Sequence, residues 1–299
     1  MALISRDSNL YTDVLRDAIK GAWSGRKALY GSGVAVLMSG LPTVDGNGES
    51  LKTGSTVRIP YWGSMGELDD VAEGDALIPR GLSSSTETAT YTQSGMAAEM
   101  TRWSRQASMV GDPHDEVARQ FVEASARRID AGLITEALTT SLSYTTDAAV
   151  SITEDTVVNA SELWEDELDD DNGVALLIVR SETRKAMRLL KDSTGRALYM
   201  NGEVDGGGMK KTLDRFAGYP VLCSNRLTRA SGVNTSLLCR RGAMAAWYNE
   251  DPIGDIEKDI LARTEITALW LDHVEHLYLR PQGGTGSKEG VIKFTTTQS

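Results

Sequence analysis

Residues 111–142 are the part of the sequence that most constrains the fold, because they read as one long amphipathic helix. Asp112 can accept the free amide protons of the first turn, and Pro113 fits the first helical position, where its missing N–H costs nothing. Apolar residues recur with a period near 3.6, at Val117, Phe121, Ala124, Ile129, Leu133, Ala137 and Leu138. At about 1.5 Å per residue the helix is about 45 Å long. Such a rod either crosses a domain as a spine or joins a coiled coil, and the irregular heptad, interrupted by Gly132, favours the spine.

Composition excludes several classes of protein. The chain has 299 residues, 40% hydrophobic and 24% charged, which is typical of a folded globular protein, and its net charge is −11. Because the chain has no excess of lysine and arginine, nucleic-acid binding is not expected as its main activity. Cys223 and Cys239 are too few for a disulfide or metal framework. The sequence shows neither a membrane-spanning run nor the apolar run of a signal peptide, so we expect a cytoplasmic protein.

Residues 45–101 have the pattern of a long two-stranded excursion from the body. Thr56–Tyr61 alternates in polarity, and Pro60 excludes a central strand, so this segment is an edge strand or part of a projecting arm. A Gly-rich, acidic stretch follows at 63–85, and a Thr-rich strand at 86–101 returns to the body. An isolated hairpin of this length is marginal in water, so we expect it to pack on the protein or on a neighbour.

The second half of the chain has the pattern of an α/β block followed by a long strand. Val174–Val179 is a continuous apolar run, as in a strand buried on both faces, and a helix begins near Ser181. The expected sequence of further elements is a helix at 154–168, a Gly-rich loop at 192–212, strands at 219–223 and 236–239, a long strand at 266–279 and a closing strand at 290–297. The predicted fold class is α+β.

Tests for catalytic and metal motifs all fail. His273 and His276 are three apart on a predicted strand, so they point to opposite faces and cannot share a metal ion. The acidic turn before Gly173 does not match a calcium loop, because that alignment places Leu168 and Val179 at ligand positions. Glycine-rich stretches at 31–36 and 283–290 lack the spacing of dinucleotide or phosphate loops. We therefore predict no catalytic residues, no metal and no cofactor.

Charged residues suggest a contact between copies of the chain. Five acidic residues crowd the middle of the hairpin, and arginines lie there and around the spine helix. The candidate contact residues are Glu67, Asp69, Asp70, Glu73, Asp75, Arg80, Arg102, Arg105, Arg119, Arg127 and Arg128. They are either two solvated surfaces or a self-complementary pair, in which one subunit's acidic hairpin lies across another's basic spine.

The order of these elements resembles the major capsid proteins of tailed bacteriophages with the Hong Kong 97-type fold. TVRIPYWGSMGELDDVAEGDALIP resembles the family's extended loop, and GDPHDEVARQFVEASARRIDAGLI its spine helix. The inserted axial domain is represented by VALLIVRSETRKAMRLLKDSTGRALY and FAGYPVLCSN, and the peripheral strand by ILARTEITALWLDHVEHLYLRP. The likeness spans nearly the whole chain. It implies an N-terminal arm (1–44), an extended loop formed by a long β-hairpin (45–101), a peripheral domain with the spine helix (102–150, helix 112–142), an axial domain (151–254), and a peripheral long strand and C-terminal strand (255–299).

The resemblance implies a structural function. Subunits of this kind assemble with themselves into hexamers and pentamers of an icosahedral head that encloses double-stranded DNA without sequence-specific binding. Implied partners are a separate scaffolding protein, a portal protein and a decoration or cement protein. The implied location is the virion, after assembly in the host cytoplasm. One alternative is an encapsulin-like nanocompartment, which shares the fold and holds protein cargo. A remote alternative is a soluble α+β enzyme that uses the Gly-rich loop as a lid.

Overall fold

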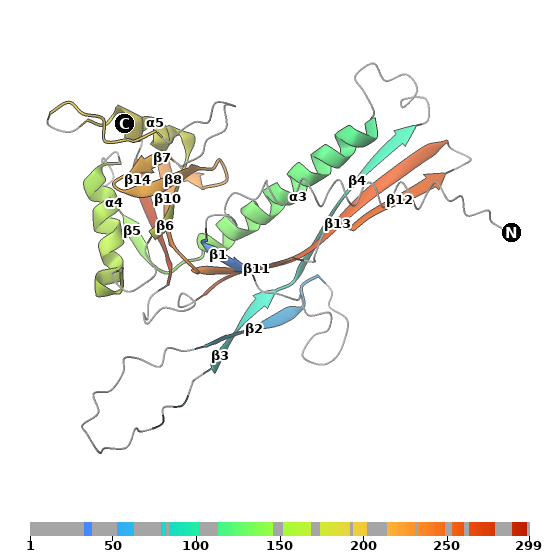
Figure 1. Ribbon diagram of the computed structural model, residues 1–299, viewed down its shortest axis with the longest axis horizontal. Coiled ribbons are helices and arrows are strands. Elements are labelled where there is room, and N and C mark those ends of the chain that lie inside the picture. The colour runs from blue at the N-terminus through green and yellow to red at the C-terminus, as the bar shows by residue number, and fades with distance from the viewer. Residues whose placement is uncertain are drawn as a thin grey trace.

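The protein is an elongated molecule in which one long helix lies along a long sheet, with a more compact sheet at one end (Figure 1). The computed structural model describes residues 33–37, 53–62, 79, 81, 84–101, 113–145, 152–168, 174–191, 194–201, 214–230, 232–248, 253–259, 263–278 and 289–297. No helix among these residues is long and apolar enough to cross a membrane.

The long sheet is organised around its longest strand, β13. Along one edge β13 pairs antiparallel with β4, and along the other it pairs first with β12 and then with β11, which in turn pairs with β1. The strands are β1 (Ala35–Leu37), β4 (Thr92–Thr101), β11 (Met244–Tyr248), β12 (Ile253–Asp259) and β13 (Thr264–Leu277). The predicted strand at 266–279 is therefore confirmed, with both its start and its end two residues earlier.

Helix α3 (Pro113–Ala137) is the predicted spine, and it covers one face of the long sheet. Phe121, Ile129 and Leu133 from its apolar stripe are buried in one cluster with Leu269 and Leu271 of β13. Alternate residues of β13 thus face the helix, as the period of two in a strand requires. The predicted amphipathic spine is present, and its apolar face is buried within its own subunit.

The C-terminal end of the spine differs from the prediction, which continued the helix to Leu142. The helix ends at Ala137, and the amides of Leu138, Thr139 and Thr140 still bond to carbonyls of its last turn. From the Thr140 hydroxyl onward, the chain bonds to another segment. The hydroxyl of Thr140 donates to the carbonyl of Val291 (2.6 Å), and the amide of Ser141 donates to the carboxylate of Glu289 (2.7 Å). Threonine and serine side chains compete in this way with helical hydrogen bonding. The chain then forms the short strand β5 (Ser143–Thr145).

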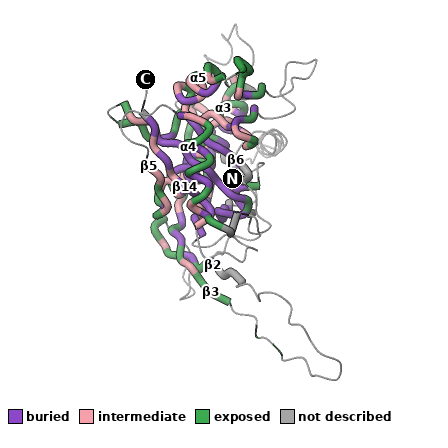
Figure 2. Tube along the Cα trace, turned by 90° about the vertical axis from the view of Figure 1, so that its left-hand side faces the viewer, coloured by how far each residue is buried: buried purple, intermediate pink, exposed green. Residues whose placement is uncertain are grey.

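The hairpin of β2 (Thr56–Trp62) and β3 (Ser84–Thr90) projects from the body (Figures 1 and 2). It is a separate two-stranded sheet, and Pro60 pairs with Thr86 in it, so both strands are edges and the predicted projecting arm is confirmed. At the root, Val57 and Ile59 are buried against the face of the long sheet that α3 leaves open.

The compact sheet contains seven strands in the order β5-β14-β10-β6-β8-β7, with β9 beside β10. In addition to β5, they are β6 (Val174–Val179), β7 (Asp214–Phe216), β8 (Tyr219–Cys223), β9 (Arg229–Ala230), β10 (Val233–Arg240) and β14 (Val291–Thr297). The predicted bounds of β6 and β8 agree with the structure. The C-terminal strand β14, which was predicted to join the peripheral domain, instead pairs with β10 and β5 in this sheet.

Both faces of the compact sheet are buried. Leu176 and Ile178 of β6 join the cluster around α3, whereas Leu177 and Val179 join a second cluster. That second cluster lies under α4 (Glu154–Ser161), the 3₁₀ segment η2 (Glu162–Leu168) and α5 (Ser181–Leu189). The apolar run of β6 therefore corresponds to a strand covered on both sides, as its sequence predicted.

Candidate assembly surfaces

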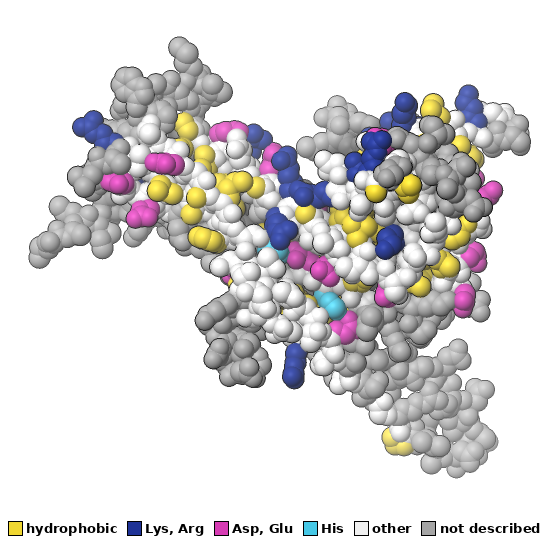
Figure 3. Space-filling model, turned by 180° about the vertical axis from the view of Figure 1, so that it is seen from behind, with side chains coloured by type: hydrophobic (Ala, Val, Ile, Leu, Met, Phe, Trp, Pro, Cys, Tyr) yellow, Lys and Arg dark blue, Asp and Glu magenta, His cyan; other side chains and the backbone are white. Residues whose placement is uncertain are grey.

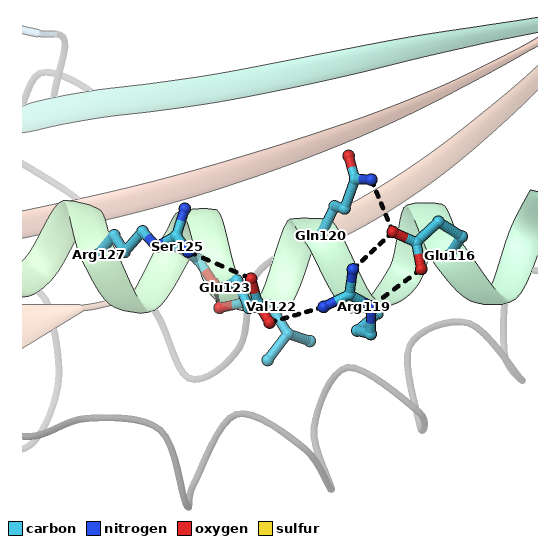
Figure 4. Close-up of polar contacts among 7 residues, drawn as sticks. All are labelled: Glu116, Arg119, Gln120, Val122, Glu123, Ser125 and Arg127. Carbon is cyan, nitrogen blue, oxygen red and sulfur yellow. Dashed lines mark hydrogen bonds and ion pairs between the residues drawn. The ribbon is translucent and has the colours of Figure 1, made fainter.

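The exposed face of α3 carries a ladder of ion pairs within the helix (Figure 4). The guanidinium of Arg119 contacts the carboxylates of Glu116 (2.6 Å) and Glu123 (2.8 Å), and Arg127 contacts Glu123 at 3.3 Å. Gln120 also donates to Glu116 (2.7 Å). These partners stand three and four residues apart, the spacing at which helix side chains meet. Hydrogen bonds from Arg119 and Gln120 lower the pKa of Glu116 to about 2.

The three spine arginines therefore have different surroundings. Arg119 is held between two glutamates of its own helix. The side chain of Arg127 is 70% exposed and has a longer ion pair. Arg128 donates from Nε to the hydroxyl of Ser94 on β4 (3.1 Å), which ties the helix to the sheet. Arg127 is thus more exposed than Arg119, whose side chain is 52% exposed, and it lacks the contact with β4 that Arg128 makes.

The other predicted contact residues lie outside the part of the chain that the structure describes. They are Glu67, Asp69, Asp70, Glu73 and Asp75 in the hairpin, with Arg80, and Arg102 and Arg105 before the spine. The pairing of an acidic hairpin with a basic spine therefore stays a prediction.

The hairpin root is fastened to β13 by polar contacts as well as apolar ones. Glu87 of β3 and Nε2 of His276 lie 2.6 Å apart, with both side chains largely buried. Burial, followed by the hydrogen bond to Asp272, raises the pKa of the Tyr91 hydroxyl to about 12. The projecting strands are thus anchored at their base by buried groups.

The two histidines on β13 have different structural roles. His273 is buried on the α3 side, with Nε2 2.9 Å from Ser94 Oγ and Nδ1 2.9 Å from the Glu275 carboxylate. His276 faces the hairpin. The prediction that the two rings point to opposite faces is confirmed. Among the described residues, no group of three or more His, Cys, Asp and Glu side chains could hold a metal ion.

One exposed apolar surface was not predicted. Trp270 and Ile266 are 45% and 38% exposed on the face of the long sheet that faces away from α3, beyond the hairpin root. Figure 3 shows hydrophobic side chains gathered over this arm of the molecule. A Cβ added to Gly95 would lie 2.7 Å from the Trp270 ring, so the indole lies directly on this glycine of β4. In the sequence, this surface is indicated by the apolar residues Ile266, Ala268 and Trp270, which alternate along the strand and therefore share one face.

Comparisons with known proteins place the chain in a family. A family model described as phage capsid protein matches residues 86–277. A search of curated protein sequences finds no significant match. Among solved structures, the capsid of an empty GTA particle is similar, with 13% identity, 91% of this chain and 90% of that chain covered, and a TM-score of 0.61.

Structures from two phages show the same similarity of fold at low identity. For Microbacterium phage Oxtober96 the identity is 13%, the coverage 87% and 88%, and the TM-score 0.59. For Mycobacterium phage Che8 the identity is 15%, 81% of this chain and 85% of that chain are covered, and the TM-score is 0.52. The family match covers well over half of the chain, so the chain belongs to the phage capsid protein family. It is a structural protein of the phage shell and a component of the virion.

Proposed function

We propose that the chain is the major subunit of an icosahedral phage head, arranged in hexamers and pentamers around double-stranded DNA. The observation that carries this proposal is the hairpin of β2 and β3, which is a two-stranded sheet on its own and is buried only at its root among the described residues. Even beside the buried root residues, the paired side chains of Arg58 and Thr88 are exposed on the other face, and so is Thr86. A two-stranded hairpin is marginal in water, and a neighbouring subunit would supply the missing packing.

The exposed part of the long sheet supports the same proposal. Trp270 and Ile266 form an apolar surface next to the hairpin root, and such surfaces commonly mark protein contacts. A closed symmetric shell repeats each modest contact many times, so the sum stabilises the particle. The described surfaces therefore fit a subunit whose packing is completed by its copies.

Within this shell, the acidic middle of the hairpin would contact the spine of a neighbour. Arg127 is the principal basic partner on the spine, because its side chain is 70% exposed, whereas Arg119 is engaged by Glu116 and Glu123. Charges at the rim of an interface chiefly set register and encounter rate. This contact would align the hairpin on its neighbour.

The remaining partners follow from the same proposal. A separate scaffolding protein would guide assembly in the host cytoplasm, and a portal protein and decoration proteins would be further partners of the shell. The role would be structural and without enzyme activity. An encapsulin-like compartment remains the second candidate, because it has the same fold, and particle contents separate the two: DNA favours the phage head and protein cargo the compartment.

Negative-stain microscopy of the purified full chain tests the function and the contact together. Wild-type protein should form closed shells, and Arg127→Glu/Arg128→Glu should remain as folded subunits because reversed charges repel the acidic hairpin. The Arg127→Gln/Arg128→Gln pair is the matched control, which removes attraction without adding repulsion and should assemble weakly. Absence of shells from the wild type, with or without a scaffolding protein, would contradict the function. Normal shells from the Glu variant would contradict only the contact.

A further inference from the structure

The acidic net charge of the chain conceals one strongly basic region. Residues 174–241, which we call the basic block, contain thirteen lysines and arginines and five aspartates and glutamates, a net charge of +8 in a chain of net charge −11. By contrast, residues 253–278 contain six acidic and two basic residues. The basic block comprises β6 to β10 and α5, at one end of the molecule.

Helix α5 presents part of this charge on one face. Thr183 and Met187 are buried against the compact sheet. Lys185 and Arg188 lie three residues apart on the opposite side and are exposed, with 45% of the Arg188 side chain accessible. Residues three apart on a helix are neighbours at its surface, so both side chains leave the same side of α5, although the Arg188 guanidinium then lies 5.3 Å over the Tyr199 ring.

The segments around α5 extend the basic surface. Met200 and Arg215 exchange backbone hydrogen bonds (2.8 and 2.9 Å), which places the exposed Arg215 beside the segment that follows α5. At the other end of the helix, the Arg180 side chain donates to the carbonyl of Leu227, next to the exposed Arg226. These contacts bring basic residues that are distant in sequence to one end of the molecule. Because Asp214 and Phe216 are buried toward α5, the exposed Arg215 projects from the other face of β7. Lys and Arg side chains are visible on this end of the molecule in Figure 3.

The acidic residues described in the block do not neutralise this surface. Glu182 is bound to Arg229 at 2.7 Å. Asp214 is buried, accepts the Tyr199 hydroxyl at 2.6 Å and lies 3.6 Å from Arg188. Each carboxylate is therefore already engaged by a neighbour, and Lys185, Arg215 and Arg226 remain exposed to a ligand.

We propose that the basic block binds the phosphate backbone of double-stranded DNA, independently of sequence, through Lys185, Arg215, Arg226 and their basic neighbours. The proposal rests on the proposed function, because a shell around DNA presents this polyanion to its subunits at high concentration. Duplex DNA carries one negative charge per about 1.7 Å of axis, and its neutralisation by Lys and Arg releases counterions. DNA binding would be a second role beside shell formation. It would also neutralise the positive charge of the basic block, which would otherwise repel the same block in other copies of the chain.

A salt series of DNA binding tests this proposal on the purified, unassembled full chain. Fluorescent duplexes of two unrelated sequences are titrated with wild type, with Lys185→Gln/Arg215→Gln, and with the control Arg58→Gln/Lys258→Gln. The control removes one lysine and one arginine, both exposed and both outside the block. The block pair should lower the slope of log affinity against log salt by about 2, whereas the control should leave it nearly unchanged. The two duplexes should bind alike.

Two results would overturn the proposal. One is equal DNA binding by Lys185→Gln/Arg215→Gln and by the control variant. The other is unchanged DNA binding by Lys185→Gln/Arg215→Gln together with loss of shells. That second result would mean that the basic surface binds the acidic segment 253–278 of another copy. Thermal unfolding verifies that each variant is folded, and Arg226→Gln, in a surface turn, gives a second reading with an expected slope change of about 1. Shell formation is scored separately by microscopy, so failure of DNA binding and failure of the shell function are distinguishable.

Discussion

The two sheets of the molecule differ in how completely a single copy of the chain covers them. The compact sheet is buried on both faces, with Leu177 and Leu176 of β6 in separate apolar clusters. The long sheet is covered by α3 on one face. On its other face, the described part of the hairpin packs on Ala245, Trp247, Val274 and Tyr278, whereas Trp270 is exposed. The compact sheet is therefore a complete core, whereas the long sheet has the surfaces expected of a part that other copies complete.

The same two regions differ in charge. The basic block lies on the compact sheet, and the acidic segment at 253–278 forms β12 and β13 of the long sheet. A single net charge for the chain averages these opposite regions. Because electrostatic attraction depends on the local charge distribution, the average misrepresents what each region can bind.

The largest expected difference between the sheets comes from one substitution made in each. Trp164→Ala removes a fully buried ring of η2 that packs in the cluster on the compact sheet and whose Nε1 donates to the carbonyl of Glu289 (2.8 Å). This substitution should cost about 3–5 kcal/mol of unfolding free energy. Trp270→Ala removes a ring that is 45% exposed and should cost about 1 kcal/mol. Urea unfolding of subunits measures both. Equal losses would contradict the distinction between a complete and an incomplete core.

A smaller effect is expected where the spine touches the long sheet. A Cβ at Gly132 would lie 2.6 Å from the Glu275 carboxylate, which is held by His273 and cannot move without losing that contact. Gly132→Ala should therefore cost about 1–2 kcal/mol despite the better helix propensity of alanine.

The same site provides its own control. In a Glu275→Ala background the obstacle is gone, so Gly132→Ala should become neutral or stabilise the subunit by up to about 1 kcal/mol. Denaturant midpoints of the four proteins in this cycle give the coupling. If Gly132→Ala lowers the free energy of unfolding equally in both backgrounds, the close approach to Glu275 is not the cause of the loss.

The smallest expected effect concerns pH. Burial raises the pKa of Glu136 on α3 above 4.5. His276 opposes this shift, and the nearby Glu275 charge adds a smaller increase. A raised pKa means that the folded state favours the protonated acid, so this group lowers stability as pH rises through its folded pKa. Glu136→Gln should therefore raise Tm more at pH 8 than at pH 4.5. A larger gain at the lower pH would show that the carboxylate is stabilising.

Much of the fold is readable from the sequence because local patterns determine it. The ends of β6 and β8 follow from an apolar run between turn residues, and the start of α3 agrees with its Pro113 signal. The end of α3 is not readable, because Thr140 and Ser141 hydrogen-bond to residues about 150 positions away. The placement of β14 is likewise decided by long-range pairing with β10.

The candidate surfaces are harder to predict than the fold. The exposure of Arg127 and the engagement of Arg119 differ although both are arginines on one helix, because the positions of glutamates around them differ. The charge of the basic block can be counted from the sequence, but the positions of its exposed residues cannot be predicted, because they come from α5, β7 and turns that approach one another only in the fold. The segregation of charge along the chain was a visible signal for it.

The junction between β3 and β4 has a mechanical consequence. Strand β3 of the hairpin continues through Tyr91 into β4, and the amide and carbonyl of Tyr91 are both bonded to the chain at Ser55 and Gly54 (2.9 and 2.8 Å). The projecting hairpin and the edge of the long sheet thus share one continuous segment of chain, which two backbone hydrogen bonds hold in place at Tyr91. Force applied to the hairpin is transmitted to β4, and from Ser94 through Arg128 to the spine. A neighbouring subunit that binds the hairpin therefore also transmits force to the spine helix α3 of the subunit that it contacts.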